Sequence, residues 1–132
     1  LPNQKIYIRY FANILSSKYK IEKKLAKHLI KNYGERAFDV MNICNGRPDL
    51  LEPLVEGFQH IKGEIIYQEK YEMAIEISDF LARRTRIAML DKIAAFNAIE
   101  PLVHDLGKER NWSAETMERE IALAKEQLKA FD

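Results

Sequence analysis

Apolar residues recur in this chain at intervals of three and four positions over almost its whole length, and this spacing constrains the fold more than any other feature. An α-helix has 3.6 residues per turn, so such residues line one side of a helix, whereas a half-buried strand needs strict alternation. No segment has a convincing strand pattern, and no internal repeat or low-complexity tract is present. The sequence therefore predicts an all-α fold, an irregular bundle of six to seven helices. The stripes begin at Ile6, Ile21, Ile66, Phe96 and Met117.

The N-terminal half predicts three helices. The first buries the stripe formed by Ile6, Tyr10, Ile14, Phe11 and Leu15. The second ends at Tyr33, because Gly34 accepts the positive φ that commonly follows a helix. A short helix begins at Glu35 and directs Cys44 inward. Residues 48–63 contain two prolines and two glycines, which predict a loop with one helical turn.

The C-terminal half predicts helices over 64–77 and 79–90, a third from Asp91 and a last one from Ser113. Ser78, Asp91 and Ser113 are the expected N-caps, because their side-chain oxygens can accept a free backbone N–H. Pro101 lies inside the third stripe, so we expect a kink or a restart there. Gly107 and Asn111 predict the end of that helix.

Length and composition exclude several classes of protein. A chain of 132 residues can form one domain with its own core. The single Cys44 excludes an internal disulfide framework, and no apolar run approaches the roughly 20 residues of a membrane span. Residues 1–5 resemble neither a start nor a signal peptide, so we expect a processed protein or an excised piece of a larger one.

Charge is distributed unevenly along the chain. Residues 1–31 carry eight basic groups and one acidic group, Glu22, whereas residues 32–132 carry 13 basic and 19 acidic groups. The basic segment is compatible with a solvated lysine-rich face, and also with an arm that meets an acidic surface. Because the net charge of the whole chain is only +1, we expect nucleic-acid binding to be weak and non-specific.

The sequence has no strong catalytic or metal-binding motif. Its five glycines stand singly, so no glycine-rich loop can cradle a phosphate. His28, His60 and His104 have no second ligand at helical spacing, and we predict no metal site. We interpret Cys44 as a small core residue, and His28 and His104 as structural histidines.

The segment richest in charged chemistry is 79–86, which contains three arginines in four positions, Arg83, Arg84 and Arg86. Guanidinium groups match phosphate oxygens, and they also pair with carboxylates. Arginines this close together point in different directions around a helix, so all three cannot serve one site. We expect structural ion pairs for at least two of them, with acids of the preceding helix that include Glu64 and Glu72. In particular, Glu72 should form a partly buried pair with Arg83 or Arg84.

The same region carries a family resemblance. The segments 63–67, 71–74, 79–87 and 90–91 occur in an order that resembles the C-terminal helical domain of the FAD-dependent glycerol-3-phosphate dehydrogenases. Tyr33-Gly34, Pro53-Leu54 and Trp112-Ser113 fit the same pattern. The resemblance covers residues 20–132 as a domain, and residues 1–19 are expected to form a helical segment or linker before it.

The resemblance implies a parent enzyme that oxidises sn-glycerol 3-phosphate to dihydroxyacetone phosphate and passes electrons from FAD to quinone. In the family, the FAD-binding and substrate-binding regions precede this segment, so no catalytic or flavin-binding residue is assigned to it. Its implied partner is the FAD- and substrate-binding part of the same protein, and its implied role is packing on that part or assembly into a homo-oligomer. The mitochondrial members lie peripherally on the inner membrane.

Two other functions are compatible with the residues alone. One is a helical nucleic-acid-binding module that uses residues 5–31 and the arginines, and the acidic balance of residues 32–132 weakens it. The other is a protein-interaction bundle.

Overall fold

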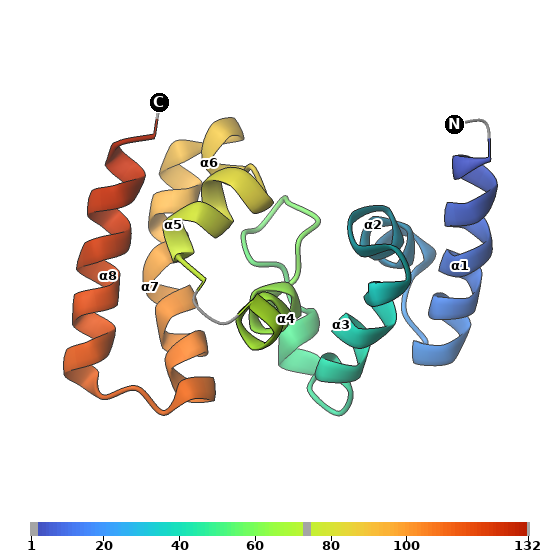
Figure 1. Ribbon diagram of the computed structural model, residues 1–132, viewed down its shortest axis with the longest axis horizontal. Helices are drawn as coiled ribbons and strands as arrows, with labels where there is room; N and C mark the ends of the chain where they lie inside the picture. Colours follow the sequence, from blue (N-terminus) through green and yellow to red (C-terminus); the bar gives the residue numbers. More distant parts are fainter. Residues whose placement is uncertain (1–2, 73–74, 132) are drawn as a thin grey trace. The chain divides into compact units, whose positions relative to one another are not determined.

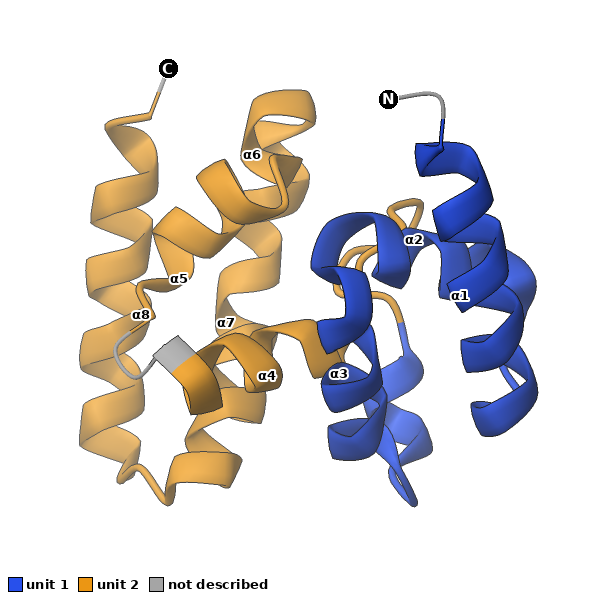
Figure 2. Ribbon diagram, turned by 45° about the vertical axis from the view of Figure 1, so that its right-hand side comes forward, with its two compact units in different colours: residues 1–52 blue, residues 53–132 orange. Residues whose placement is uncertain are grey.

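The computed structural model describes residues 3–72 and 75–131, apart from the side chain of Glu72. The chain forms two compact units, Leu1–Glu52 and Pro53–Asp132 (Figure 2). The described residues contain helices and no strand, with a single antiparallel bridge between Pro53 and Ile61. The predicted all-α fold is therefore confirmed. Among the described residues, no helix combines the length and the apolar character that crossing a membrane requires.

The first unit consists of three α-helices and two 3₁₀ turns. They are α1 (Gln4–Tyr19), α2 (Lys23–Tyr33), η1 (Gly34–Arg36), α3 (Ala37–Cys44) and η2 (Pro48–Leu51). Helix α1 packs along α2 (Figure 1). The sequence set a boundary between residues 19 and 20. The compact units divide after Glu52, and α1 packs on α2 within the first of them. The domain boundary itself stays a prediction.

Helix α1 buries only part of the stripe that the sequence predicted. Ala12 and Leu15 are fully buried, whereas Ile6 and Tyr10 are 60% and 61% exposed. The helix carries two apolar stripes, and packing on α2 selects the one that contains Leu15. Tyr19 continues this inner stripe, and its hydroxyl group donates to the carbonyl oxygen of Phe38 at 3.4 Å.

The second unit contains α4 (Lys62–Glu72), α5 (Ile77–Asp79), the π-helical turn η3 (Phe80–Arg84), α6 (Ile87–Leu90), α7 (Lys92–Arg110) and α8 (Ala114–Lys129). Helices α7 and α8 lie side by side, and α5 and α6 pack against them (Figure 1). The core of the unit is apolar and centred on α7. Its fully buried members include Ile65, Leu81, Ile99, Val103 and Leu128.

The helix predicted over 64–77 does not reach Ile77. It begins at Lys62, and the buried Glu64 accepts the backbone N–H of Ile61 at 2.7 Å, the reciprocal half of a capping box. Ile75 and Glu76 are not helical. The N–H of Ile75 donates to a side-chain oxygen of Glu69 at 3.4 Å instead of continuing the helical ladder. Met73 and Ala74, which we placed on this helix, lie outside the described residues.

Helix α7 continues through Pro101 without the predicted restart. Pro101 is exposed, so the carbonyl group that loses its helical partner faces water, while the next two residues are buried and hold the helix in place. Gly107 also lies within the helix. The end is at Asn111, whose positive φ of 56° forms a left-handed C-cap.

The predicted N-caps at Asp91 and Ser113 are confirmed. The Asp91 carboxylate accepts the N–H of Ala94 at 3.0 Å, and the Ser113 hydroxyl accepts the N–H of Thr116 at 3.1 Å. The second cap reverses the chain and brings α8 back along α7. The two helices approach closely at Gly107, where an added Cβ would lie 2.6 Å from Cε and 3.1 Å from Cγ of Met117.

The buried and exposed faces of α1 predict losses of stability that differ in size for two neighbouring substitutions. Leu15→Ala should lower the free energy of unfolding by about 2–5 kcal/mol, because it opens a cavity in a packed interface. Ile14→Ala, one position earlier, should cost less than about 1 kcal/mol because that side chain is partly exposed. Urea unfolding followed by circular dichroism measures both. Equal losses would show that α1 does not pack through Leu15.

The close approach of α7 and α8 predicts that Gly107 does not tolerate a branched side chain. Gly107→Val should destabilise the second unit by about 1–3 kcal/mol, because the new methyl groups overpack against Met117. The matched control is Lys108→Val on the exposed side of α7, which should cost about 0.5 kcal/mol or less through helix propensity. Similar midpoints for the two variants in thermal unfolding would contradict the close packing.

Candidate functional site

A single helix capped by Ser78 was predicted over 79–90, and the structure instead forms three short elements over 77–90. Glu76 is the N-cap of α5, while Ser78 is buried and donates a hydrogen bond to Gln127 of α8 at 2.8 Å. The N–H of Thr85 donates to the carbonyl oxygen of Phe80 at 2.9 Å, an i to i+5 bond. Such π turns widen the helix and occur frequently at functional sites. Periodicity alone cannot predict them, since they insert one residue into a helix.

Arg86 separates η3 from α6 in a left-handed conformation, with φ 61° and ψ 14°. This position follows the end of a helical segment, where glycine is the common residue because it has no Cβ. The buried Thr85 holds the turn on both sides. Its hydroxyl donates to the carbonyl oxygen of Leu81 at 3.2 Å and accepts the N–H of Ile87 at 3.3 Å.

The distorted backbone sends the three arginines in two directions. Arg84 donates to the side-chain oxygen of Gln68 on α4 at 3.1 Å. Arg83 forms an ion pair with Asp79 at 3.2 Å, one helical turn earlier, and its guanidinium lies over the ring of Phe131 at 5.4 Å. The prediction that the three do not serve one site agrees with this geometry. Arg83 and Arg86, however, share one.

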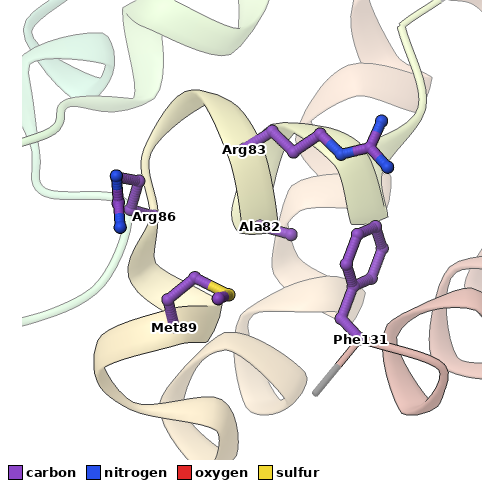
Figure 3. A pocket seen from close by; sticks show the side chains of 5 residues that line it. All are labelled: Ala82, Arg83, Arg86, Met89 and Phe131. Carbon is purple, nitrogen blue, oxygen red and sulfur yellow. The ribbon is translucent and has the colours of Figure 1, made fainter.

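That shared site is a pocket of about 380 Å³, which lies between residues 82–89 and Phe131, just after the end of α8 (Figure 3). Arg83 and Phe131 form one side, Arg86 and Met89 form the other, and Ala82 lies between them. The pocket therefore combines two guanidinium groups with an aromatic ring, a thioether and a methyl group. It lies wholly within the second unit.

Phe131 is held in place by contacts from three directions. Its carbonyl oxygen accepts a hydrogen bond from Nζ of Lys92 at 2.6 Å, and its N–H donates to Leu128 at 3.2 Å. Arg83 covers the ring. These contacts fix the last turn of α8 against the start of α7 and keep the aromatic wall of the pocket in position.

The acids proposed as arginine partners lie in several environments. Glu64 is fully buried, and its second carboxylate oxygen lies 3.1 Å from Nδ1 of His60. His60 therefore has a potential ligand at helical spacing, and the prediction that it has none was wrong. Glu69, on the same helix, pairs with Arg110 of α7. The side chain of Glu72 lies outside the described residues, so its pairing with Arg83 or Arg84 stays a prediction, as does the wider ion-pair assignment for Glu64 and Arg86.

The chemistry of the pocket suits a small anionic group joined to an apolar one. Two guanidinium groups can donate to carboxylate or phosphate oxygens, and the remaining walls favour carbon over water. The pocket does not fit FAD, because a dinucleotide requires a glycine-rich turn and a helix N-terminus for its pyrophosphate. No glycine is among the residues that line this pocket.

The sequence located the arginines but not the rest of the pocket. Asp79 could have been found, because it precedes Arg83 by four positions, the spacing of a helical ion pair. Met89 and Phe131 carried no signal in the sequence, because only the packing of the helices brings them to the arginines. Among the other candidates, Cys44 and His28 are buried, and Asn32 donates to the His28 backbone at 2.7 Å. His104 is exposed, so a structural role in the core is wrong for it.

Comparison with known proteins defines the class of domain. The family model described as the C-terminal domain of alpha-glycerophosphate oxidase matches residues 5–117, and the chain belongs to this family. Among curated proteins, the mitochondrial glycerol-3-phosphate dehydrogenase of Rattus norvegicus is 37% identical over 123 residues, which are 90% of this chain and 16% of the relative. No solved structure was found to match the chain.

The similarity extends to plants and bacteria. The mitochondrial glycerol-3-phosphate dehydrogenase SDP6 of Arabidopsis thaliana is 36% identical over 106 residues, covering 80% of this chain and 17% of the relative. The glycerol-3-phosphate dehydrogenase of Synechocystis is 30% identical over 101 residues, covering 76% and 18%. The chain thus spans about a sixth of the length of the curated relatives that it matches.

The left-handed turn predicts that Arg86→Gly does not weaken the domain. Glycine relieves the Cβ strain of this conformation but loses more chain entropy on folding, so the net effect should lie between zero and a gain of about 1 kcal/mol. The matched control is Arg119→Gly, within helix α8, which should cost about 1 kcal/mol. Denaturant unfolding compares the two. A loss at Arg86 equal to that at Arg119 would contradict the left-handed geometry.

Proposed function

We propose that the chain is the accessory C-terminal domain of an FAD-dependent glycerol-3-phosphate dehydrogenase. The observation that carries the proposal is the family match over residues 5–117, together with relatives that are glycerol-3-phosphate dehydrogenases about six times as long as the matched segment. The complete protein would oxidise sn-glycerol 3-phosphate to dihydroxyacetone phosphate and deliver the electrons to quinone.

FAD and substrate would be bound by the rest of the protein, called the flavoprotein part below. The proposal assigns no chemical step to the residues of this chain. Support comes from the 132-residue sequence, which has no glycine-rich nucleotide loop, and from the pocket at Arg83 and Arg86, whose lining does not suit a dinucleotide. When bound, the flavin would supply the redox chemistry, and this domain would supply structure.

The structural role is to pack on the flavoprotein part or to support assembly of a homo-oligomer. Two compact helical units with their own apolar cores suit such a role. The proposal also includes the location of the mitochondrial relatives, with the complete protein attached peripherally to the inner membrane.

The test compares three proteins: the full-length chain, the full-length chain without these 132 residues, and the isolated 132 residues. The full-length protein should bind FAD and reduce a soluble quinone analogue when glycerol 3-phosphate is added. The isolated segment should do neither, because its sequence contains no glycine-rich nucleotide loop. Absorbance of bound flavin and the initial rate of quinone reduction are the measurements.

The truncated protein separates an accessory from a catalytic role. We expect it to retain flavin but to release it at a lower temperature, because it loses the packing of this domain. Stoichiometric flavin on the isolated segment would refute the assignment, as would a full-length protein that does not oxidise glycerol 3-phosphate. Unchanged thermal release of flavin after truncation would remove the packing role.

A further inference from the structure

The two arginines of the pocket have N–H donors that the described residues do not occupy. Among the described residues, the guanidinium of Arg86 has no hydrogen-bond or ion-pair partner. Arg83 shares only one oxygen contact with Asp79, and its side chain is 72% exposed. A guanidinium carries five N–H donors, so both groups can donate to a further oxygen without losing the contacts that they already make.

Apolar side chains lie exposed in the residues that follow the pocket. Met89 forms part of the pocket wall, and Leu90 and Ile93, at the corner between α6 and α7, are 73% and 75% exposed. Three large apolar side chains thus face water within five residues. Single exposed apolar residues are ordinary, but a cluster beside a charged pocket is typical of an interaction surface.

Residue 86 adds a second indication. Its conformation favours glycine, yet the position carries an arginine whose side chain lines the pocket. An arginine retained in a strained turn, and held there by Thr85, is the kind of local cost that occurs at functional positions.

We infer that this surface, formed by Arg83, Arg86, Met89, Leu90, Ile93 and Phe131, binds an acidic segment of the flavoprotein part of the same chain. The inference rests on the proposed function and names the surface that performs it. The segment would place an Asp or Glu carboxylate between the two guanidinium groups and an adjacent apolar side chain against Met89 or Phe131. About five-sixths of the length of the relatives lies outside the matched region, so the same molecule offers a large tethered surface.

A second copy of this chain is the main competing occupant. Helix α8 carries acidic residues on its exposed side, among them Glu115 and Glu118, which could reach the arginines of a neighbouring molecule. A tethered segment has the advantage of a high effective concentration, whereas a second copy must pay for association at each encounter. The experiment therefore distinguishes contacts within one chain from contacts between chains.

The test uses the full-length protein with the photoreactive substitution Leu90→p-benzoylphenylalanine. On irradiation, we expect a cross-link within one chain, to a peptide of the flavoprotein part that contains Asp or Glu. Adding Arg86→Gly should lower the cross-link yield at least tenfold, because it removes one guanidinium without weakening the turn. Arg86→Lys, which keeps the charge but loses the two-pronged donor geometry, should restore only part of the yield. The matched control, Arg119→Ala on α8, should leave it unchanged.

Each other result overturns the inference. Cross-links between two chains would identify a homo-oligomer surface instead, and an absence of cross-links would show that the corner faces water. An undiminished yield in Arg86→Gly would show that the guanidinium is not part of the contact. Flavin content and glycerol 3-phosphate oxidation are measured on the same samples. A protein that is active but not cross-linked refutes only the surface, whereas a cross-linked protein without this activity refutes only the enzymatic assignment.

Discussion

The left-handed turn at Arg86 is the constraint on which the arrangement of the second unit depends. It ends the π-helical turn and starts α6 in a new direction, so that α6 packs on α7 while the preceding turn packs on α5. Thr85 fixes this geometry with one hydrogen bond on each side of the turn. Positions 83 and 86 are three residues apart, so their side chains would also lie on one face of a continuous helix. The interrupted helix keeps both guanidinium groups on one pocket and adds Met89 of α6 to its wall.

Around this turn, polar contacts between elements fix the positions of the helices. Ser78 joins α5 to α8, Arg84 joins η3 to α4, and Lys92 joins α7 to the end of α8. Hydrogen bonds contribute about 0.5–1.5 kcal/mol each, so the apolar core provides most of the stability. The contacts instead set the orientation of the helices, because a hydrogen bond requires specific geometry and apolar burial does not. The distorted segment is thereby held at both ends.

The sequence predicted the fold class and the helix ends better than it predicted the faces and the irregular segments. Asp91, Ser113 and Gly34 act through their own side chains or backbone, so their effects can be read locally. The buried face of α1 could not be read in this way, because two apolar stripes compete and only α2 decides between them. Pro101 is tolerated because it faces water, which periodicity does not reveal. The pocket residues Met89 and Phe131 come together only through the packing of α8.

The single tryptophan of the chain, Trp112, lies in the short link between α7 and α8, inside the second unit. It is half-buried beside Arg110 and Leu123, so its surroundings change when these helices separate. The first unit has tyrosines but no indole. Excitation at wavelengths that tryptophan absorbs and tyrosine does not therefore reports on the second unit alone, because the first unit contributes no tryptophan fluorescence. The chain carries a built-in optical label that can report whether its two units lose structure together or in succession.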